Sequence, residues 1–370
     1  MILEKKVARP SALLTLKLLV LSGLAALVPV GASLGAESTM PSKYVETIKP
    51  ELAKQYAYTE DGAYTKALNI PTYEWMPVGS EPTVMILAIH GLTLHGRRFR
   101  VIARTGALHN HGFVSLDMRG FGSCYYDDPK TFSTDGEDRK KVNHEKSYED
   151  IVALAKMIKA NHPNTPLLAM GESLGCTFCV KLAAEHPELI HGLILSAPAV
   201  RLNPDMFIGH GQIPQGVKAF VRHSHELNIE SFFTDLVSEK QEIRDEMEDD
   251  PYIRKQLKIG ELLSTDKFVA STADWGKLTS KDLSVLILQG NKDGCVSPKH
   301  VVDLMNNMPS DDQTLEWKGN FGHLQLETLF VRASVVDGIG NWMRNHNSEN
   351  EQRMEDLREC IAGLGATVSH

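Results

Sequence analysis

Continuous apolar runs, rather than alternating apolar and polar positions, recur along the 370-residue chain. The clearest run, Thr83–Ile89, ends at a histidine and a glycine. Runs of this kind are typical of strands that are buried on both faces of a parallel sheet. Further runs of the same kind occupy residues 112–116, 166–170, 189–195 and 283–288, and a weaker one occupies 314–317. A segment of mixed aromatic and β-branched residues at 64–78 is expected to open the sheet as a strand or hairpin.

Helical patterns separate these runs. Apolar residues recur at helical spacing over 148–160, 174–185, 300–305 and 326–344. Strands that alternate with helices in this way predict an α/β fold with a mostly parallel, doubly wound sheet.

One long segment, residues 201–280, interrupts the alternation. It contains no buried-strand run, and acidic residues with basic residues between them become frequent from Glu239 to Asp250. This mixture predicts solvated amphipathic helices, so we interpret the segment as a helical insertion that forms a cap. The predicted organisation is a leader at 1–36, the first part of the core at 37–200, the cap insertion at 201–280, the second part of the core at 281–345 and a C-terminal tail at 346–370.

The leader has the pattern of a secretory signal peptide. Lys5, Lys6 and Arg9 precede an apolar stretch at 18–32, and small residues follow it. That stretch is shorter than the ~20 residues that a membrane-spanning helix needs. We therefore expect export to the periplasm or the exterior, with an uncleaved membrane anchor as the alternative. The leader carries four basic residues and one acidic residue, so its removal would change the net charge from −8 to −11.

Composition excludes several classes of protein and partner. With 42% hydrophobic and 23% charged residues, the chain resembles globular rather than disordered proteins. The 47 acidic residues outnumber the 39 lysines and arginines, so we expect no nucleic-acid partner. Five cysteines are too few for a disulfide framework in a chain of this length. The sequence does not indicate whether the protein forms oligomers.

A candidate nucleophile lies in the segment Gly171-Glu172-Ser173-Leu174-Gly175, between a predicted strand and a predicted helix. This is the G-x-S-x-G pattern in the strand-turn-helix context that it requires. Small residues on both sides of Ser173 allow a sharp turn that exposes the hydroxyl group. A serine hydroxyl also needs a base, which is itself oriented by a carboxylate.

The base and the acid are sought after later strands, because ligands of open α/β sheets bind at the carboxyl ends of the strands. Asp293 lies in the turn after the run at 283–288, and His323 lies in a glycine-containing loop after the run at 314–317. Asp117 also ends a predicted strand and could orient His323 instead. We expect Asp117 to brace its own loop with Arg119.

Two backbone N–H groups are candidates for binding the oxyanion that forms during acyl transfer. The N–H of Leu174 begins the helix after the serine. The other is expected in the loop after the run Thr83–Ile89, where Gly91 allows a close approach of the backbone, and we nominate Leu92.

Other groups of reactive residues suggest different chemistry. Cys176 and Cys179 have the spacing of half a zinc site, but no second pair follows, so we interpret them as buried thiols of a helix. Two histidine pairs, at 109 and 111 and at 223 and 225, have no third ligand at a supporting spacing, and we expect them on the surface. No glycine-rich phosphate loop is present. We therefore expect neither a metal nor a cofactor.

Several motifs together resemble one family. They are the segment His90–Phe99 with the pattern H-G-x-x-x-H-x-x-R-F, the segment Asp117–Ser123 with D-x-R-G-x-G-S, the segment Ser196–Pro198 with S-x-P, the strand 285–290 followed by Asp293, and the pair Gly322-His323. These motifs are similar to those of α/β-hydrolases of the monoacylglycerol lipase and lysophospholipase group, which is related to serine aminopeptidase S33. The resemblance implies the α/β-hydrolase fold, an esterase reaction, the triad Ser173, Asp293 and His323, and oxyanion donors at Leu92 and Leu174.

Two departures from this group affect the site. Glu172 stands where the group usually has histidine, and this places an acidic residue beside the nucleophile. Leu94 stands where an acidic residue is common, and Thr93 replaces the usual second glycine of the loop.

The function that these observations favour is hydrolysis of carboxylic esters through an acyl-enzyme. The resemblance implies a small ester or lipid substrate such as a monoacylglycerol or lysophospholipid. Because one fold supports several reactions, an aminopeptidase or acyltransferase on the same triad is the alternative. The remaining alternative is a non-catalytic binding protein on this fold. The intact nucleophile, acid and base argue against it, because binding does not require all three.

Overall fold

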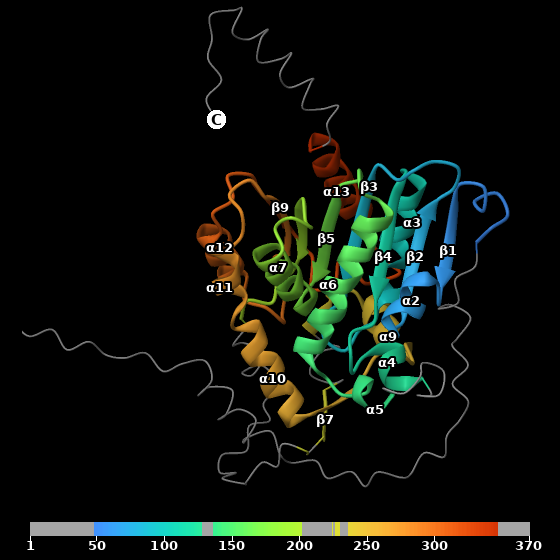
Figure 1. Cartoon of the computed structure of the whole chain (residues 1–370). Coiled ribbons are helices and arrows are strands. Elements are labelled where there is room, and N and C mark those ends of the chain that lie inside the picture. The colour runs from blue at the N-terminus through green and yellow to red at the C-terminus, as the bar shows by residue number, and fades with distance from the viewer. Residues whose placement is uncertain (1–47, 128–135, 202–223, 225, 230–235, 347–370) are drawn as a thin grey trace, which may run out of the picture.

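The computed structural model describes residues 48–127, 136–201, 224, 226–229 and 236–346 (Figure 1). Its centre is an eight-stranded sheet in the order β1-β2-β4-β3-β5-β6-β9-β10. The strands are β1 (Tyr56–Glu60), β2 (Thr72–Pro77), β3 (Val84–Ile89), β4 (His111–Leu116), β5 (Leu167–Glu172), β6 (Gly192–Ser196), β9 (Ser284–Gly290) and β10 (Gln313–Lys318). Strands β4 to β10 of this order are parallel, whereas β2 is antiparallel to both β1 and β4. The predicted mostly parallel α/β sheet is confirmed.

Helices cover both faces of the sheet. On one face lie α6 (His144–Asn161), α7 (Leu174–Glu185) and α12 (Pro298–Asn307), of which α6 and α7 stand in front of the strands in Figure 1. On the other face lie α3 (Arg100–Leu108) and α13 (Ala333–Asn345). Shorter helices connect these elements: α2 (Ala63–Leu68), η2 (Gly96–Phe99), α4 (Gly122–Tyr126) and α5 (Gly136–Arg139).

Strand β3 shows why its sequence is apolar without alternation. Met85, Leu87 and Ile89 point to the face covered by α6 and α7 and belong to one hydrophobic core. Val84, Ile86 and Ala88 point to the face covered by α3 and α13 and belong to a second core. Because successive side chains of a strand point to opposite faces, a strand between two helical layers must be apolar at every position.

The segment between β6 and β9 departs from the strand-helix alternation, as predicted. Its described part contains α9 (Gln241–Asp249), α10 (Ile259–Val269) and α11 (Thr272–Gly276). It also contains a ribbon of two antiparallel strands, β7 (Glu226–Asn228) and β8 (Gln256–Lys258), which the charge pattern does not indicate. Helix α11 packs against α7 and α12 of the core. The boundaries proposed for the cap insertion stay a prediction, and residues 202–223, 225 and 230–235 lie outside the described part.

Two predicted elements differ from the structure. The expected strand or hairpin at 64–78 is helix α2 followed by strand β2, because β2 pairs with β1 upstream rather than folding back on itself. The predicted helix over 326–344 begins only at Ala333. The backbone N–H groups of residues 326, 327 and 329 instead donate to buried carboxylates elsewhere in the chain, which holds this stretch as a loop.

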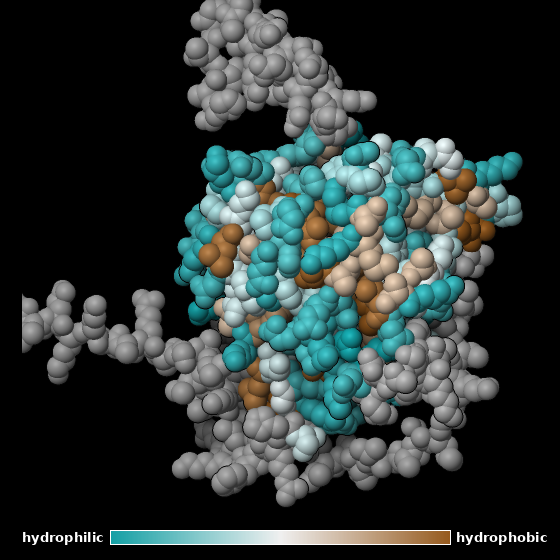
Figure 2. Space-filling model, in the orientation of Figure 1, coloured by the Kyte–Doolittle hydropathy of each residue, from teal (hydrophilic) through white to brown (hydrophobic). Residues whose placement is uncertain are grey.

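The predicted leader and tail lie outside the described residues. Within the described ranges, no helix combines the length and the apolar character that crossing a bilayer requires. The molecular face in Figure 2 is largely hydrophilic, with hydrophobic residues in small separated groups. Cys176 and Cys179 are fully buried in α7, which confirms their interpretation as thiols of a helix interior.

Candidate active site

The predicted site residues follow neighbouring parallel strands. Ser173 follows β5, Asp293 follows β9, His323 follows β10, and the loop that contains Leu92 follows β3. The carboxyl ends of these strands lie at one edge of the sheet, in the order β3-β5-β6-β9-β10. The fold therefore gathers the four segments at the edge where open α/β sheets bind ligands.

Ser173 occupies a strained turn between β5 and α7. Its φ of 54° and ψ of −116° lie in a region that non-glycine residues rarely adopt. The backbone N–H of Ser173 donates to the carbonyl of Ser196 at 2.9 Å, and the carbonyl of Ser173 accepts from Ala199 at 3.2 Å. These bonds fix the turn against the end of β6. The side chain stays partly exposed, whereas its neighbours Glu172 and Leu174 are buried.

The two glycines of the motif are required by close backbone contacts. A Cβ atom on Gly171 would lie 2.6 Å from the carbonyl carbon of Gly175, in the first turn of α7. A Cβ atom on Gly175 would overlap the carbonyl oxygen of Ile89 at the end of β3. Gly175 is therefore restricted by the neighbouring strand β3, and Gly171 by the helix that follows.

Asp293 and His323 form a buried hydrogen-bonded pair. The Nδ1 atom of His323 lies 2.9 Å from Oδ2 of Asp293. Oδ2 also accepts from the side-chain amide of Gln289 at 3.1 Å, and Oδ1 accepts from the N–H groups of Cys295 and Val296 at 2.9 and 3.0 Å. All acceptor positions of the carboxylate are therefore occupied, which fixes its orientation toward the imidazole.

The pair also shifts the proton affinities of both groups. Burial disfavours the charged form of Asp293, but the neighbouring His323 and the hydrogen bonds outweigh it and lower the pKa of the carboxyl group. Burial likewise disfavours the charged form of His323, but Asp293 and then Glu172 outweigh it and raise the pKa of the imidazole above its usual value. The imidazole is therefore a stronger base than a free histidine side chain.

Backbone contacts hold the turn of Asp293 against the loop of His323. Lys292 donates its N–H to the carbonyl of Phe321 at 2.8 Å, and Asn291 donates to the carbonyl of Lys318 at 3.0 Å. The side chain of Asn291 accepts from the N–H of Asn320 at 2.6 Å. Asp293 and His323 therefore belong to one connected unit rather than to two independent loops.

The nominated oxyanion donors lie at the start of α7 and in the loop after β3. Leu174 is the first residue of α7, where helical N–H groups have no partner within the helix. In the part of the chain that the structure describes, the N–H groups of Leu92 and Leu174 donate to no other protein group. Both are therefore available to a bound molecule.

Two buried acids that sequence reasoning did not assign to the site connect these loops. The carboxylate of Glu172 accepts from the backbone N–H groups of Gln325 and Glu327 at 2.7 and 2.9 Å. The carboxylate of Glu327 accepts from the N–H of Gly91 at 2.8 Å. Glu172 could have been assigned to the site from the sequence, because it stands where the related group usually has histidine. Nothing in the local sequence distinguishes Glu327 from other acidic residues.

The insertion contacts the same loops through buried charges. Asp250 lies 3.0 Å from Nε2 of His95 and accepts from Nη1 of Arg98 at 2.7 Å. These two residues are the second histidine and the arginine of the motif at 90–99. Burial opposes the charge of Asp250, but His95 and Arg98 outweigh it and lower the pKa of this carboxyl group. The carbonyl of Val237 accepts from the N–H groups of His323 and Leu324 at 2.8 and 2.9 Å.

The other candidate residues have different roles. Asp117 accepts from Tyr73, Gly96 and Ser123 and braces its own loop, as expected. The expected pairing with Arg119 is wrong, because the guanidinium group of Arg119 binds Asp150 at 2.7 Å.

Of the two histidine pairs, one lies within the described residues, and its members make hydrogen bonds to threonines. His109 and His111 contact Thr105 and Thr83, respectively, and the pair at 223 and 225 lies outside the described residues. In the described part, one group has three ligand atoms within 4.8 Å of one another: Asp293, Cys295 and His323. Two of its members are the hydrogen-bonded acid and base.

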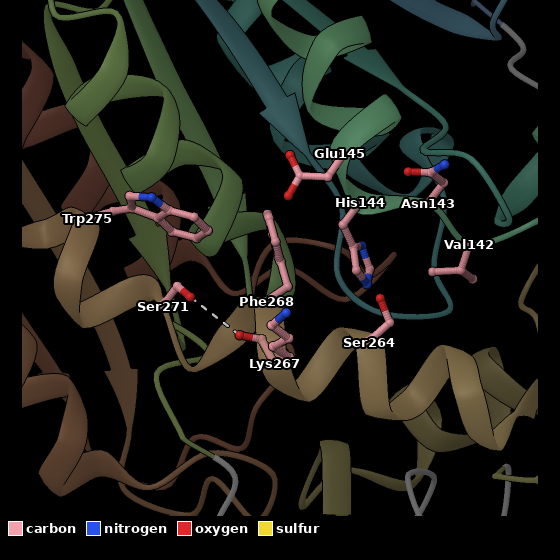
Figure 3. Close-up of a pocket in the computed structure, with 9 residues that line it drawn as sticks. All are labelled: Val142, Asn143, His144, Glu145, Ser264, Lys267, Phe268, Ser271 and Trp275. Carbon is pink, nitrogen blue, oxygen red and sulfur yellow. Dashed lines mark hydrogen bonds between the residues drawn. The ribbon is translucent and has the colours of Figure 1, made fainter. Parts of the chain in front are cut away.

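A hollow of about 380 Å³ lies apart from these residues, between the start of α6 and the helices α10 and α11. Figure 3 shows His144, Phe268 and Trp275 around it, and the ring of His144 stacks on Phe268 with 4.9 Å between the ring centroids. Nε2 of His144 lies 2.8 Å from the hydroxyl of Thr265, and burial lowers the pKa of His144 to about 4. The histidine is a neutral packing residue, and we assign the hollow no role.

Known families and proteins match most of this chain. The family model of serine aminopeptidase, S33, matches residues 80–327. Monoglyceride lipase from Mus musculus is 24% identical over 271 residues, which cover 73% of this chain and 84% of the lipase. Monoacylglycerol lipase from Mycolicibacterium smegmatis is 22% identical over 278 residues, which cover 74% and 91%.

Solved structures share the fold. A soluble variant of monoglyceride lipase from Saccharomyces cerevisiae, in complex with a substrate analog, has a TM-score of 0.63 at 18% identity and covers 86% of this chain and 100% of its own. A carboxyl esterase from Bacillus coagulans has a TM-score of 0.59 at 16% identity, with 78% and 98% covered. The predicted α/β-hydrolase fold and the prediction of a carboxylic ester hydrolase are confirmed. The chain belongs to the serine aminopeptidase S33 family of α/β-hydrolases.

Proposed function

We propose that the protein cleaves carboxylic esters through a covalent acyl-enzyme on Ser173, with His323 as the base and Asp293 as the acid that orients it. The observation that carries this proposal is the buried hydrogen bond of 2.9 Å between His323 Nδ1 and Asp293 Oδ2. Because Nδ1 of His323 contacts Asp293, Nε2 is the ring nitrogen that remains for proton exchange with Ser173. The strained turn of Ser173 at the same edge of the sheet supplies the nucleophile.

The reaction proceeds in two halves. Nε2 of His323 takes the hydroxyl proton of Ser173 as the oxygen attacks the ester carbonyl, and the N–H groups of Leu92 and Leu174 bind the oxyanion. Collapse of this intermediate breaks the bond to the alcohol, which leaves with the proton from His323. A water molecule then loses a proton to His323 and attacks the acyl carbon, and the proton returns to Ser173 as the carboxylic acid departs.

We further propose a monoacylglycerol or a similar monoacyl lipid, such as a lysophospholipid, as the substrate. Support comes from relatives that carry the name monoglyceride lipase and that align over most of their own length. The family model is named for an aminopeptidase, which makes amide cleavage on the same triad the second candidate. We also propose export, on the basis of the pattern in residues 1–36.

The direct test replaces the nucleophile. Ser173→Ala should lower kcat for a p-nitrophenyl ester by at least about 10⁴-fold, because the acyl-enzyme cannot form. Ser310→Ala is the control, since Ser310 is a serine that lies before β10, next to the start of β9, at the amino ends of the parallel strands and so far from Ser173. Its activity should stay within about twofold of the wild type. Full activity of Ser173→Ala would refute the assignment.

Substrate class is tested with a series of monoacylglycerols of increasing chain length, run beside lysophospholipids and aminoacyl amides. A preference for long-chain monoacyl esters supports the lipid assignment. Faster cleavage of aminoacyl amides would favour the peptidase instead, with the same triad.

A further inference from the structure

Glu172 makes contacts that the reaction above does not use. It is the last residue of β5, stands directly before Ser173, and has an exposed fraction of 0%. A buried carboxylate is costly unless hydrogen bonds satisfy it, so its partners show what it holds in place.

The partners of Glu172 come from two other elements. Its Oε1 accepts from the hydroxyl of Ser196 at 2.6 Å and from the N–H of Gln325 at 2.7 Å. Its Oε2 accepts from the N–H of Glu327 at 2.9 Å, and the N–H of Leu326 lies 3.1 and 3.2 Å from the two oxygens. Three consecutive backbone donors therefore converge on one carboxylate, two to four residues beyond His323. Both oxygens only accept, which is the pattern of the ionised form.

Glu327 extends this network to the loop after β3. Its Oε2 accepts from the N–H of Gly91, and its backbone carbonyl accepts from Nε of Arg98 at 2.9 Å. A Cβ atom on Gly91 would lie 3.1 Å from Oε2 of Glu327 and 3.4 Å from the carbonyl oxygen of Glu172. Gly91 is thus seated between the two acids, directly before the nominated oxyanion donor Leu92.

The two acids share one negative charge. Both are fully buried, and two buried carboxylates this closely connected do not both ionise. Burial and then the neighbouring Glu172 raise the pKa of Glu327 well above its usual value. Burial also raises the pKa of Glu172, but the hydrogen bonds from Ser196, Glu327 and Gln325 and the nearby His323 oppose that rise. Both oxygens of Glu172 accept hydrogen bonds, whereas Oε1 of Glu327 has no partner among the described residues, so we assign the charge to Glu172.

Building on the proposed function, we propose that Glu172 is a positioning residue whose negative charge stabilises the protonated form of His323 during the reaction and whose hydrogen bonds hold the loops of His323 and Leu92 in register. An interaction that strengthens when charge develops in the transition state raises kcat rather than lowering KM. The residue would therefore act on turnover.

Other titratable groups near His323 must be separated from this effect. Asp293 is its hydrogen-bonded partner, and Glu239 approaches Gly322 in the same loop while it pairs with Arg332. The remaining neighbours are neutral in the working range of pH, because burial raises the pKa of each well above its usual value: Cys295, and on the far side of Glu172, Glu327 and Cys176. Asp293, through its hydrogen bond, and Glu172, through its charge, are the two buried carboxylates that raise the pKa of the imidazole.

The test compares Glu172→Gln with Ser196→Ala. Glu172→Gln removes the charge while keeping the shape, so kcat should fall by about 10- to 100-fold with KM within about threefold. The acid limb of kcat/KM should also move to lower pH by at least half a unit, because the proton on His323 loses a stabilising charge. Ser196→Ala removes one donor and keeps the charge, so its acid limb should stay within about 0.2 units of the wild type. An unmoved acid limb in folded Glu172→Gln would overturn the proposal.

A conservative variant separates charge from position. Glu172→Asp keeps the charge on a shorter side chain that does not reach all three N–H groups. We expect an acid limb near that of the wild type together with a reduced kcat. A kcat equal to the wild type would show that the hydrogen bonds hold nothing that turnover needs. Glu172→Asp also provides the test if Glu172→Gln does not fold.

A measurement without turnover distinguishes failure of this inference from failure of the proposed function. The imidazole of His323 is titrated by NMR in Ser173→Ala and in Ser173→Ala/Glu172→Gln. The pKa should be lower by at least half a unit in the double variant, whatever reaction the protein catalyses. Equal values would refute the role of Glu172 even if Ser173→Ala is inactive.

Discussion

Asp117 and Asp293 are both buried aspartates at the carboxyl ends of parallel strands, yet one braces a loop and the other faces a histidine. Asp117 accepts from Tyr73, Gly96 and Ser123, all close to its own end of the sheet. Asp293 accepts from Cys295, Val296 and Gln289, and its remaining position faces His323. Asp117 accepts three hydrogen bonds, whereas Asp293 has the same number from its own surroundings and a fourth contact with the imidazole, which separates their roles.

Sheet order explains the difference. Strand β9, which precedes Asp293, is the direct neighbour of β10, which precedes His323. Strand β4, which precedes Asp117, is five positions away from β10 in the sheet order. At about 4.8 Å for each strand, Asp117 stands roughly 24 Å of sheet away from the histidine. Asp117 is therefore too far along the sheet to orient His323, whereas Asp293 follows the strand next to β10.

The largest effect should come from Asp293→Asn. The amide preserves the shape but removes the charge and stabilises the wrong tautomer of His323, so we expect kcat to fall by about 10⁴-fold. Steady-state kinetics on a p-nitrophenyl ester measures this, with circular dichroism to confirm folding. A loss of less than tenfold would remove the contrast between the two aspartates.

The pH dependence of the wild type should report the same pair. His323 must be neutral to accept the proton of Ser173, and Asp293 and Glu172 raise the pKa of the imidazole. Activity should therefore rise with pH and level off only above the usual pKa of about 6.5, with about a tenfold loss for each pH unit below the midpoint. A profile of kcat/KM from pH 5 to 9 gives this value. A midpoint below that of a free histidine would contradict the arrangement.

Asp117→Asn should act on stability instead. The amide nitrogen would face one of three donors that now bind the carboxylate, and leaving a buried donor unpaired costs about 1–3 kcal/mol of unfolding free energy. For the folded variant, kcat should stay within tenfold of the wild type. Urea denaturation and kinetics on the same samples separate the two quantities. A loss of kcat comparable to that of Asp293→Asn would show that Asp117 also serves the reaction.

The smallest effects should come from the neutral partners of the two carboxylates. Tyr73→Phe removes the hydroxyl that donates to Asp117 at 2.8 Å and should lower the unfolding free energy by about 1–2 kcal/mol, with little change in kcat. Gln289→Leu removes a donor to Asp293 and should lower kcat by a few-fold. A loss of kcat in Tyr73→Phe together with a loss of stability alone in Gln289→Leu would contradict the separate roles of Asp117 and Asp293.

The sequence predicts the buried strands and the elbow well because their causes are local. The apolar run of β3 and the glycines around Ser173 reflect contacts that any chain with this topology must make. Helix α7 has the predicted bounds for the same reason. The positions of Asp293 and His323 could also be predicted, because strand ends at one edge of a parallel sheet converge.

The loop at 325–329 could not be predicted, because its conformation is fixed by distant carboxylates. Glu172 is more than 150 positions away in sequence from the N–H groups that it binds. Glu246 of the insertion accepts from the N–H of Leu329 and the hydroxyl of Thr328. The apolar pattern of 326–344 indicates a helix, and only these long-range hydrogen bonds prevent one.

The buried ties between the insertion and the core bear on how such enzymes can be recombined. Asp250 and Glu246 of the insertion hold Arg98, His95 and Thr328 of the core. A core that lacks these partners would leave the two acids of this insertion unpaired, and an insertion that lacks the acids would leave the guanidinium group of Arg98 without its carboxylates. The exchangeable module of this scaffold is therefore a discontinuous one, made of the insertion together with the few core positions that neutralise it.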